Sequence, residues 1–71
     1  MKRGYEVILE DVETKDVVKY MLKKTEDTAK KCFLQNMMKY RVIVNKFDDE
    51  HGTSTNVIDN LGYWIATGKW K

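Results

Sequence analysis

The sequence predicts a small α+β domain in the order β-β-α-β, followed by one or two further strands. We expect a mainly antiparallel sheet with one helix packed on one of its faces. Three observations predict this class: residues 5–24 alternate like a two-stranded hairpin, Thr25 begins a helix-like segment, and β-branched residues fill 42–44. With 71 residues, the whole of 1–71 is assigned to a single domain.

The hairpin prediction rests on pairing across two strands within residues 5–24. When the chain folds back near residues 13–16, opposite charges meet on one side of the ladder and apolar side chains meet on the other. The charged pairs in this register are Glu10 with Lys19 and Glu6 with Lys23, and the apolar pairs are Val7 with Leu22 and Leu9 with Tyr20. The side chains expected to face the helix are Val7, Leu9, Val18, Tyr20 and Leu22.

One long helix over 16–39 is the alternative, because its apolar residues also fit a spacing of 3.6 residues. Thr25 favours the split, since it suits a helix N-cap and the acids Glu26 and Asp27 follow in the first turn. The helix is therefore expected over about 26–39. The residues expected on its buried side are Ala29, Phe33 and Met37, with Cys32 and Asn36 beside them.

The rest of the chain predicts a strand at 40–47, a polar loop at 48–56 and a terminal hairpin with strands near 55–58 and 63–67. A helix remains the alternative for the last segment, because its apolar residues also follow a helical spacing. Those residues are Val57, Ile58, Leu61, Trp64 and Ile65.

Composition narrows the class of protein. Thirteen basic and 11 acidic residues give a net charge of +2, and 42% of residues are hydrophobic, which suits a globular chain. No apolar run approaches the roughly 18 residues of a membrane span, and the start of the chain does not resemble a signal peptide. Cys32 is the only cysteine, so no internal disulfide forms and a reducing, cytoplasmic setting is expected.

Catalytic and metal motifs are weak in this sequence. One cysteine and one histidine, Cys32 and His51, make a poor basis for nucleophilic catalysis. The acidic run 48–51 lacks the spacing of a calcium loop. The stretch 66–69 lacks the earlier glycine of a phosphate loop, because Gly62 is one position too early, and Trp70 stands in place of its final Ser or Thr. We therefore expect no enzyme activity, no cofactor and no metal site.

A surplus of apolar residues on the second sheet face predicts a protein-contact surface. The residues expected there are Ile8, Val12, Val17, Met21, Ile43 and Phe47, with Trp64 and Trp70 as aromatic anchors. The partner would be another protein or a second copy of the chain in a homodimer. The alternative is structural: the terminal strands fold over this face and bury it.

Single-stranded nucleic acid is the alternative partner. Basic and aromatic residues interleave at Lys39, Tyr40 and Arg41 and again at Lys69 and Trp70. Aromatic rings stack on bases while cations hold phosphates, so this pattern is typical of such binding modules. The low net charge argues against it.

The hairpin at 5–24, the helix start at 25–31 and the strand at 40–47 together resemble small accessory proteins of bacteriophages and prophages. Some anti-CRISPR inhibitors share this sheet-plus-helix layout. The resemblance covers about two-thirds of the chain and includes no diagnostic motif. It implies a cytoplasmic, non-enzymatic protein that docks on a macromolecule of a bacterial host.

Overall fold

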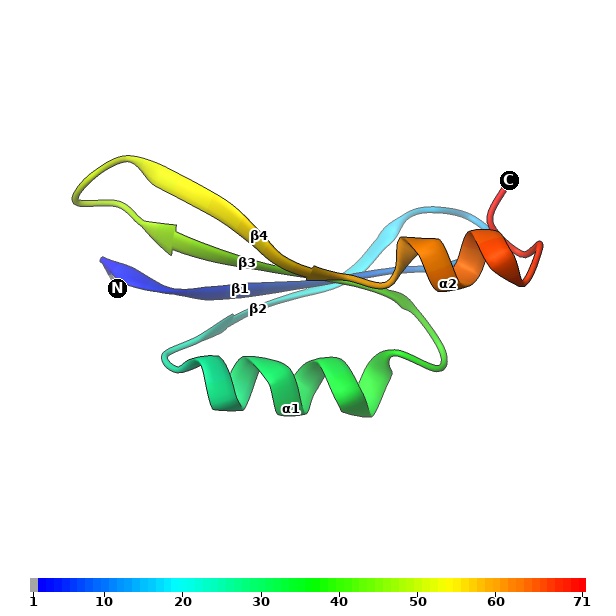
Figure 1. Ribbon diagram of the computed structural model, residues 1–71, viewed down its shortest axis with the longest axis horizontal. Helices are drawn as coiled ribbons and strands as arrows, with labels where there is room; N and C mark the ends of the chain where they lie inside the picture. Colours follow the sequence, from blue (N-terminus) through cyan, green and yellow to red (C-terminus); the bar gives the residue numbers. More distant parts are fainter. Residues whose placement is uncertain (1) are drawn as a thin grey trace.

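The computed structural model describes residues 2–71 and contains a four-stranded antiparallel sheet with two helices. The elements in chain order are β1 (Arg3–Glu10), β2 (Val17–Lys23), α1 (Glu26–Asn36), β3 (Arg41–Asp48), β4 (Thr53–Asp59) and α2 (Leu61–Ala66). The strand order is β2-β1-β3-β4, so β1 and β3 are central and the connection through α1 crosses over β1. Figure 1 shows α1 lying along one side of the sheet and α2 at one end of it. The predicted α+β class is confirmed.

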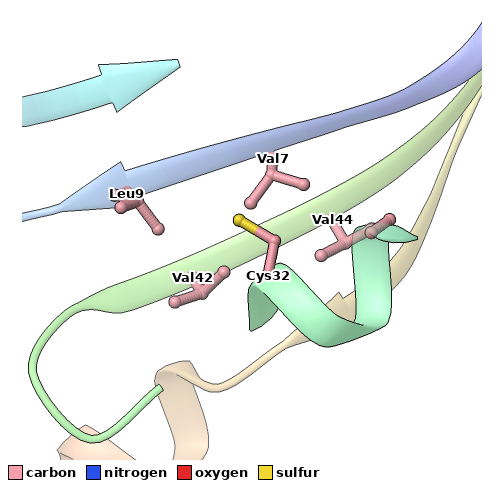
Figure 2. Packing of buried hydrophobic residues seen from close by; sticks show 6 residues of the cluster. Val7, Leu9, Cys32, Val42 and Val44 are labelled. Atoms are coloured by element: carbon pink, nitrogen blue, oxygen red, sulfur yellow. The ribbon is translucent and has the colours of Figure 1, made fainter. Parts of the chain in front are cut away.

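The core lies between α1 and the two central strands (Figure 2). Alternate residues of β1 and β3 point toward the helix, and Ala29 and Cys32 of α1 pack on them. The buried strand residues are Val7, Leu9, Val42 and Val44. This period-two burial is what a sheet with one covered face requires.

Helix α1 begins where the sequence predicts. The Thr25 hydroxyl accepts a hydrogen bond from the Thr28 N–H at 3.2 Å, which caps the first turn. The helix ends at Asn36, three residues earlier than predicted. Its end has a local cause, because the Asn36 carbonyl accepts the N–H groups of both Lys39 and Tyr40 and turns the chain toward β3.

The hairpin of β1 and β2 is confirmed, but its predicted register is wrong by one residue. Glu6 lies opposite Leu22 rather than Lys23, and Leu9 lies opposite Lys19. Because side chains alternate along a strand, a slip of one residue turns every β2 side chain to the other face. The predicted faces of Val18, Tyr20, Leu22 and Met21 are corrected accordingly: the first three are exposed, and Met21 packs against the core.

The connecting loop fixes this register. The Asp11 carboxylate accepts hydrogen bonds from the N–H groups of Glu13 and Thr14, and the Asp11 N–H donates to the Asp16 carbonyl. Lys15 adopts a left-handed conformation, with φ at 65°, that completes the turn. An irregularity between Leu9 and Glu10 in the ladder then shifts the pairing once more. The predicted register is based on charge pairs between the strands and does not include these hydrogen bonds within the loop.

The C-terminal segment corrects a second prediction. The predicted strand near 55–58 is present within the longer β4, and the predicted polar loop 48–56 is shorter than expected, since β4 begins at Thr53. The predicted strand at 63–67 is wrong, because Leu61–Ala66 forms α2. Trp64 explains the helix: its side chain is only 4% exposed, and its indole N–H donates to the Tyr40 carbonyl at 3.0 Å.

Asn60 joins three parts of the fold and is the one buried polar residue of the described chain, 8% exposed. Its side-chain oxygen accepts the Val42 N–H at 2.7 Å, at the start of β3. Its side-chain nitrogen donates to the carbonyls of Met37 and Tyr40, at 3.0 and 3.1 Å. Asn60 therefore connects the end of α1, the start of β3 and the entry to α2.

Removing this side chain should destabilise the fold. Asn60→Ala leaves a buried N–H without its partner, so we expect the free energy of unfolding to fall by about 2 kcal/mol. Gln35→Ala is the matched control, because this exposed amide on α1 makes none of the hydrogen bonds found within residues 2–71, and it should change stability by less than about 0.5 kcal/mol. Urea unfolding followed by circular dichroism measures both. Equal losses for the two variants would contradict the role assigned to Asn60.

Candidate protein-binding face

The sheet face that points away from α1, here called the open face, carries five large apolar or aromatic side chains. They are Ile8 of β1, Tyr20 and Leu22 of β2, and Ile43 and Phe47 of β3. Ile8 lies opposite Ile43 of β3 and opposite Tyr20 of β2, so these three side chains are neighbours across the sheet. Tyr20 and Leu22 are 53% and 49% exposed. Such exposure of large side chains on one face is typical of a contact surface.

A row of hydrogen bonds crosses all four strands of the open face. The Tyr20 hydroxyl donates to one Glu6 carboxylate oxygen at 2.5 Å, and the Asn45 amide donates to the other at 2.9 Å. The Asn56 amide donates in turn to the Asn45 side-chain oxygen at 3.0 Å. The bond to Glu6 raises the pKa of Tyr20, because the carboxylate favours the protonated phenol.

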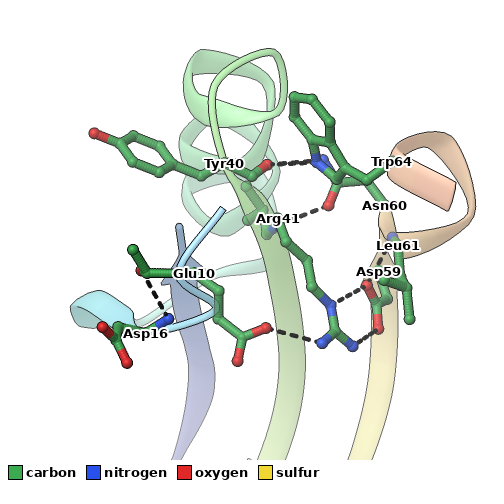
Figure 3. A network of polar contacts seen from close by, with 10 residues as sticks. Glu10, Asp16, Tyr40, Arg41, Asp59, Asn60, Leu61 and Trp64 are labelled. Atoms are coloured by element: carbon green, nitrogen blue, oxygen red, sulfur yellow. Dashed lines mark hydrogen bonds and ion pairs between the residues drawn. The ribbon is translucent and has the colours of Figure 1, made fainter. Parts of the chain in front are cut away.

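A second row, of ion pairs, crosses β1, β3 and β4 (Figure 3). The Arg41 guanidinium donates to Glu10 at 2.8 Å and to both oxygens of Asp59, at 3.2 and 2.9 Å. The hydrogen bonds to Asp59 and the charges of both acids raise the pKa of Arg41 despite its partial burial. Trp70 stacks on Arg41 with 5.1 Å between the guanidinium carbon and the ring centre.

A depression lies between β2 and the β3–β4 turn, beside the row of hydrogen bonds and away from the Arg41 ion pairs. Tyr20, Leu22 and Phe47 supply its apolar lining, and Glu6 and Asp49 contribute the charges. Acids also dominate the rest of the open face, where Arg41 is outnumbered by Glu6, Glu10 and Asp59. The surface is therefore apolar at its centre and negative overall.

The residues predicted to bind a protein are only partly brought together. Ile8, Ile43 and Phe47 share the open face, and Val17 shares the side of Glu10, its partner in the ladder. Val12, Met21 and Trp64 are elsewhere: Val12 is buried in the β1–β2 loop, Met21 packs against the core, and Trp64 is the buried residue of α2.

Trp70 has a structural contact of its own. Both Lys15, at 5.3 Å from the ring centre, and Arg41 make cation–π contacts with its ring, so the C-terminal segment covers the Arg41 end of the open face. Tyr20 and Leu22 stay exposed at the other positions. The alternative in which terminal strands bury the whole face is therefore wrong for the described chain: β4 extends the sheet as an edge strand instead.

The residues of the nucleic-acid alternative are divided between contacts within the chain. Tyr40 packs against the core, and Arg41 is engaged by two carboxylates and Trp70. Lys39 and Lys69 do come together, with Lys71, in a depression that also contains the acids Asp11 and Glu13. Of this set only Arg41 and Trp70 stack on each other, and the set is divided between the core, the Arg41 ion pairs and the lysine depression.

Sequence reasoning missed the polar residues that organise the open face. The predicted register is wrong by one residue, so it places Tyr20 and Leu22 on the wrong face. It also pairs Glu6 and Glu10 with lysines of β2, whereas β3 supplies Asn45 to Glu6 and Arg41 to Glu10. The signal that could have found the correct pairing is Arg41, because it lies directly opposite Glu10 when β1 and β3 are aligned through their valines.

The predicted catalytic and metal candidates lie apart. Cys32 is buried in the core, whereas His51 lies exposed in the β3–β4 turn, where its Nδ1 is 2.8 Å from Asp48. The hydrogen bond from His51 lowers the pKa of Asp48. Across residues 2–71 no three His, Cys, Asp or Glu side chains gather as a metal-binding group would require, and no helix in that range has the length and apolarity to span a bilayer.

Comparisons of the chain with protein-family models, with curated proteins and with solved structures found no significant match. The resemblance to bacteriophage accessory proteins accordingly stays a prediction.

The Arg41 ion pairs make a prediction about acid stability. Burial raises the pKa of Asp59, but the hydrogen bonds from Arg41 and Leu61 outweigh it, so the net pKa is lowered. The folded pKa then lies below the unfolded value of about 3.9, and the stabilisation is present above that pH and lost as the pH falls through the folded pKa. Asp59→Asn should therefore lose less stability than the wild type between about pH 6 and about pH 2.

Chemical denaturation across that pH range measures the difference. Asp16→Asn is the matched control, because its exposed carboxylate takes part in none of the hydrogen bonds or ion pairs found within residues 2–71. The control should keep the acid dependence of the wild type. Parallel pH profiles for the wild type and Asp59→Asn would show that the ion pair adds nothing to stability.

Proposed function

We propose that this chain is a small, non-enzymatic interaction protein that binds another protein through the open face of its sheet. The single observation that carries the proposal is the cluster of exposed Tyr20 and Leu22 with half-buried Phe47, in the depression beside the row of hydrogen bonds. The setting we propose is the cytoplasm of a bacterium, with the gene carried by a phage or prophage. The single cysteine, kept buried as a thiol, agrees with a reducing compartment.

The open face is suited to burial because its polar groups already have partners. Glu6 accepts from Tyr20 and Asn45, and Arg41 is paired with both Glu10 and Asp59. Covering a polar group is unfavourable mainly when it loses water without gaining a hydrogen bond. Here an apolar surface could pack on Tyr20 and Leu22 without leaving a buried donor or acceptor of these two rows unpaired.

Charge favours a particular kind of partner. The open face has three carboxylates against one guanidinium, from Glu6, Glu10, Asp59 and Arg41. A nucleic-acid backbone would meet repulsion there, and so would a second copy of the same face. The partner that fits is a protein whose contact surface is apolar at the centre and basic at the rim.

The test is affinity capture with a charge placed in the apolar cluster. Leu22→Glu puts a carboxylate on the open face at a half-exposed position, so the fold should persist while binding falls. Leu34→Glu is the matched control: the same change at a residue 65% exposed on α1. Nuclease-treated bacterial lysate is passed over each immobilised variant, and retained proteins are identified by mass spectrometry.

We expect the wild type and Leu34→Glu to retain the same protein, and Leu22→Glu to retain at most about a tenth as much. Circular dichroism verifies that all three chains are folded. Retention that is equal for all three, or that occurs only with a parallel sample of lysate left without nuclease, would refute binding through this face. A dimer found by sedimentation and abolished only by Leu22→Glu would make the partner a second copy.

A further inference from the structure

Strand β2 is an edge of the sheet, and no other strand in residues 2–71 pairs with its outer side. None of its seven residues is buried. An edge strand presents a row of backbone N–H and C=O groups that can hydrogen-bond to an added strand. Strand β2 also presents Tyr20 and Leu22 to the open face, but the docking proposed above uses those side chains and not the backbone groups of this edge.

A groove runs beside this edge on the side of α1, and its charges are all positive. Lys19 and Lys23 reach it from β2, and Lys31 reaches it from α1. No acidic side chain lines the groove; the remaining lining residues are Leu9, Met21, Thr28, Cys32, Gln35 and Asn36. Within the described chain, none of these lysines takes part in an ion pair.

We propose that β2 binds an extended acidic peptide as a fifth strand, with the acidic side chains of the peptide in the lysine groove. Residues of the added strand opposite Lys19, Met21 and Lys23 would point into the groove, because opposed residues share a face. Residues opposite Tyr20 and Leu22 would point to the other side, toward apolar groups. The sequence that fits alternates acidic and apolar residues.

Two other occupants fit less well. In an antiparallel pair of two β2 strands centred on Met21, Lys19 of one copy would lie opposite Lys23 of the other, and like charges directly opposed are unfavourable. Lysines on an edge strand are a common protection against such self-pairing. A nucleic-acid strand would satisfy the lysines but has no alternating N–H and C=O groups to continue the sheet.

The experiment uses two capped peptides of about seven residues with the same composition. One alternates glutamate and valine, and the other has its glutamates consecutive, so that both carry the same charge. Binding to the full chain is measured by fluorescence anisotropy, and amide hydrogen exchange is followed by NMR. We expect the alternating peptide to bind about ten-fold tighter and to slow exchange in β2.

The matched variants remove equal charge in different places. Lys19→Gln with Lys23→Gln removes two charges from the groove, and Lys30→Gln with Lys46→Gln removes two charges outside it. The first pair should weaken the alternating peptide about ten-fold and the second should leave it unchanged. Thermal unfolding establishes that each variant is folded.

Equal binding of the two peptides, equal weakening by the two variant pairs, or unchanged exchange in β2 would each overturn the proposal. Displacement of the peptide by an oligothymidylate that binds more tightly at the same ionic strength would assign the groove to nucleic acid instead. Capture through Leu22 does not depend on the groove lysines. If the peptide does not bind but Leu22-dependent capture persists, only the fifth-strand proposal fails. If the peptide binds but capture does not depend on Leu22, only the open-face proposal fails.

Discussion

The register of β2 against β1 is the constraint on which the surfaces of this protein depend. Since side chains alternate along a strand, one residue of slip exchanges everything that β2 presents to its two sides. The loop closed by Asp11 and Asp16, with Lys15 in a left-handed conformation, leads into the observed pairing. In that pairing Tyr20 and Leu22 reach the open face, and the β2 lysines line the groove beside α1.

The central strands give the open face its order. Because β1 has neighbours on both sides, Glu6 accepts hydrogen bonds from Tyr20 of β2 and Asn45 of β3, while Glu10 pairs with Arg41 of β3. Arg41 holds three strands together at one end of the sheet, and Trp70 closes over it. At the same end, the Asn60 side chain hydrogen-bonds to backbone groups and so holds α1, β3 and α2 together. This end of the sheet is held by several polar contacts, and the exposed apolar cluster lies away from it.

Local patterns predicted those parts of the fold that have local causes. The hairpin, the cap at Thr25 and the valine-rich strand β3 follow from alternation and capping chemistry that a single sequence displays. Strand propensity at 63–67 lost to a tertiary contact, because Trp64 gains burial and a hydrogen bond only when α2 forms. Of the site, Ile8 and Phe47 were predicted from β1 and β3 alone. Tyr20 was missed because its face depends on side-chain bonds within the loop.

The most direct test of this account is the β1–β2 register, measured by cross-strand nuclear Overhauser effects between backbone protons in solution. The account predicts contacts that pair Glu6 with Leu22 and Ile8 with Tyr20. Contacts that pair Glu6 with Lys23 would contradict it. They would turn Tyr20 and Leu22 toward α1 and remove both the apolar cluster of the open face and the lysine groove.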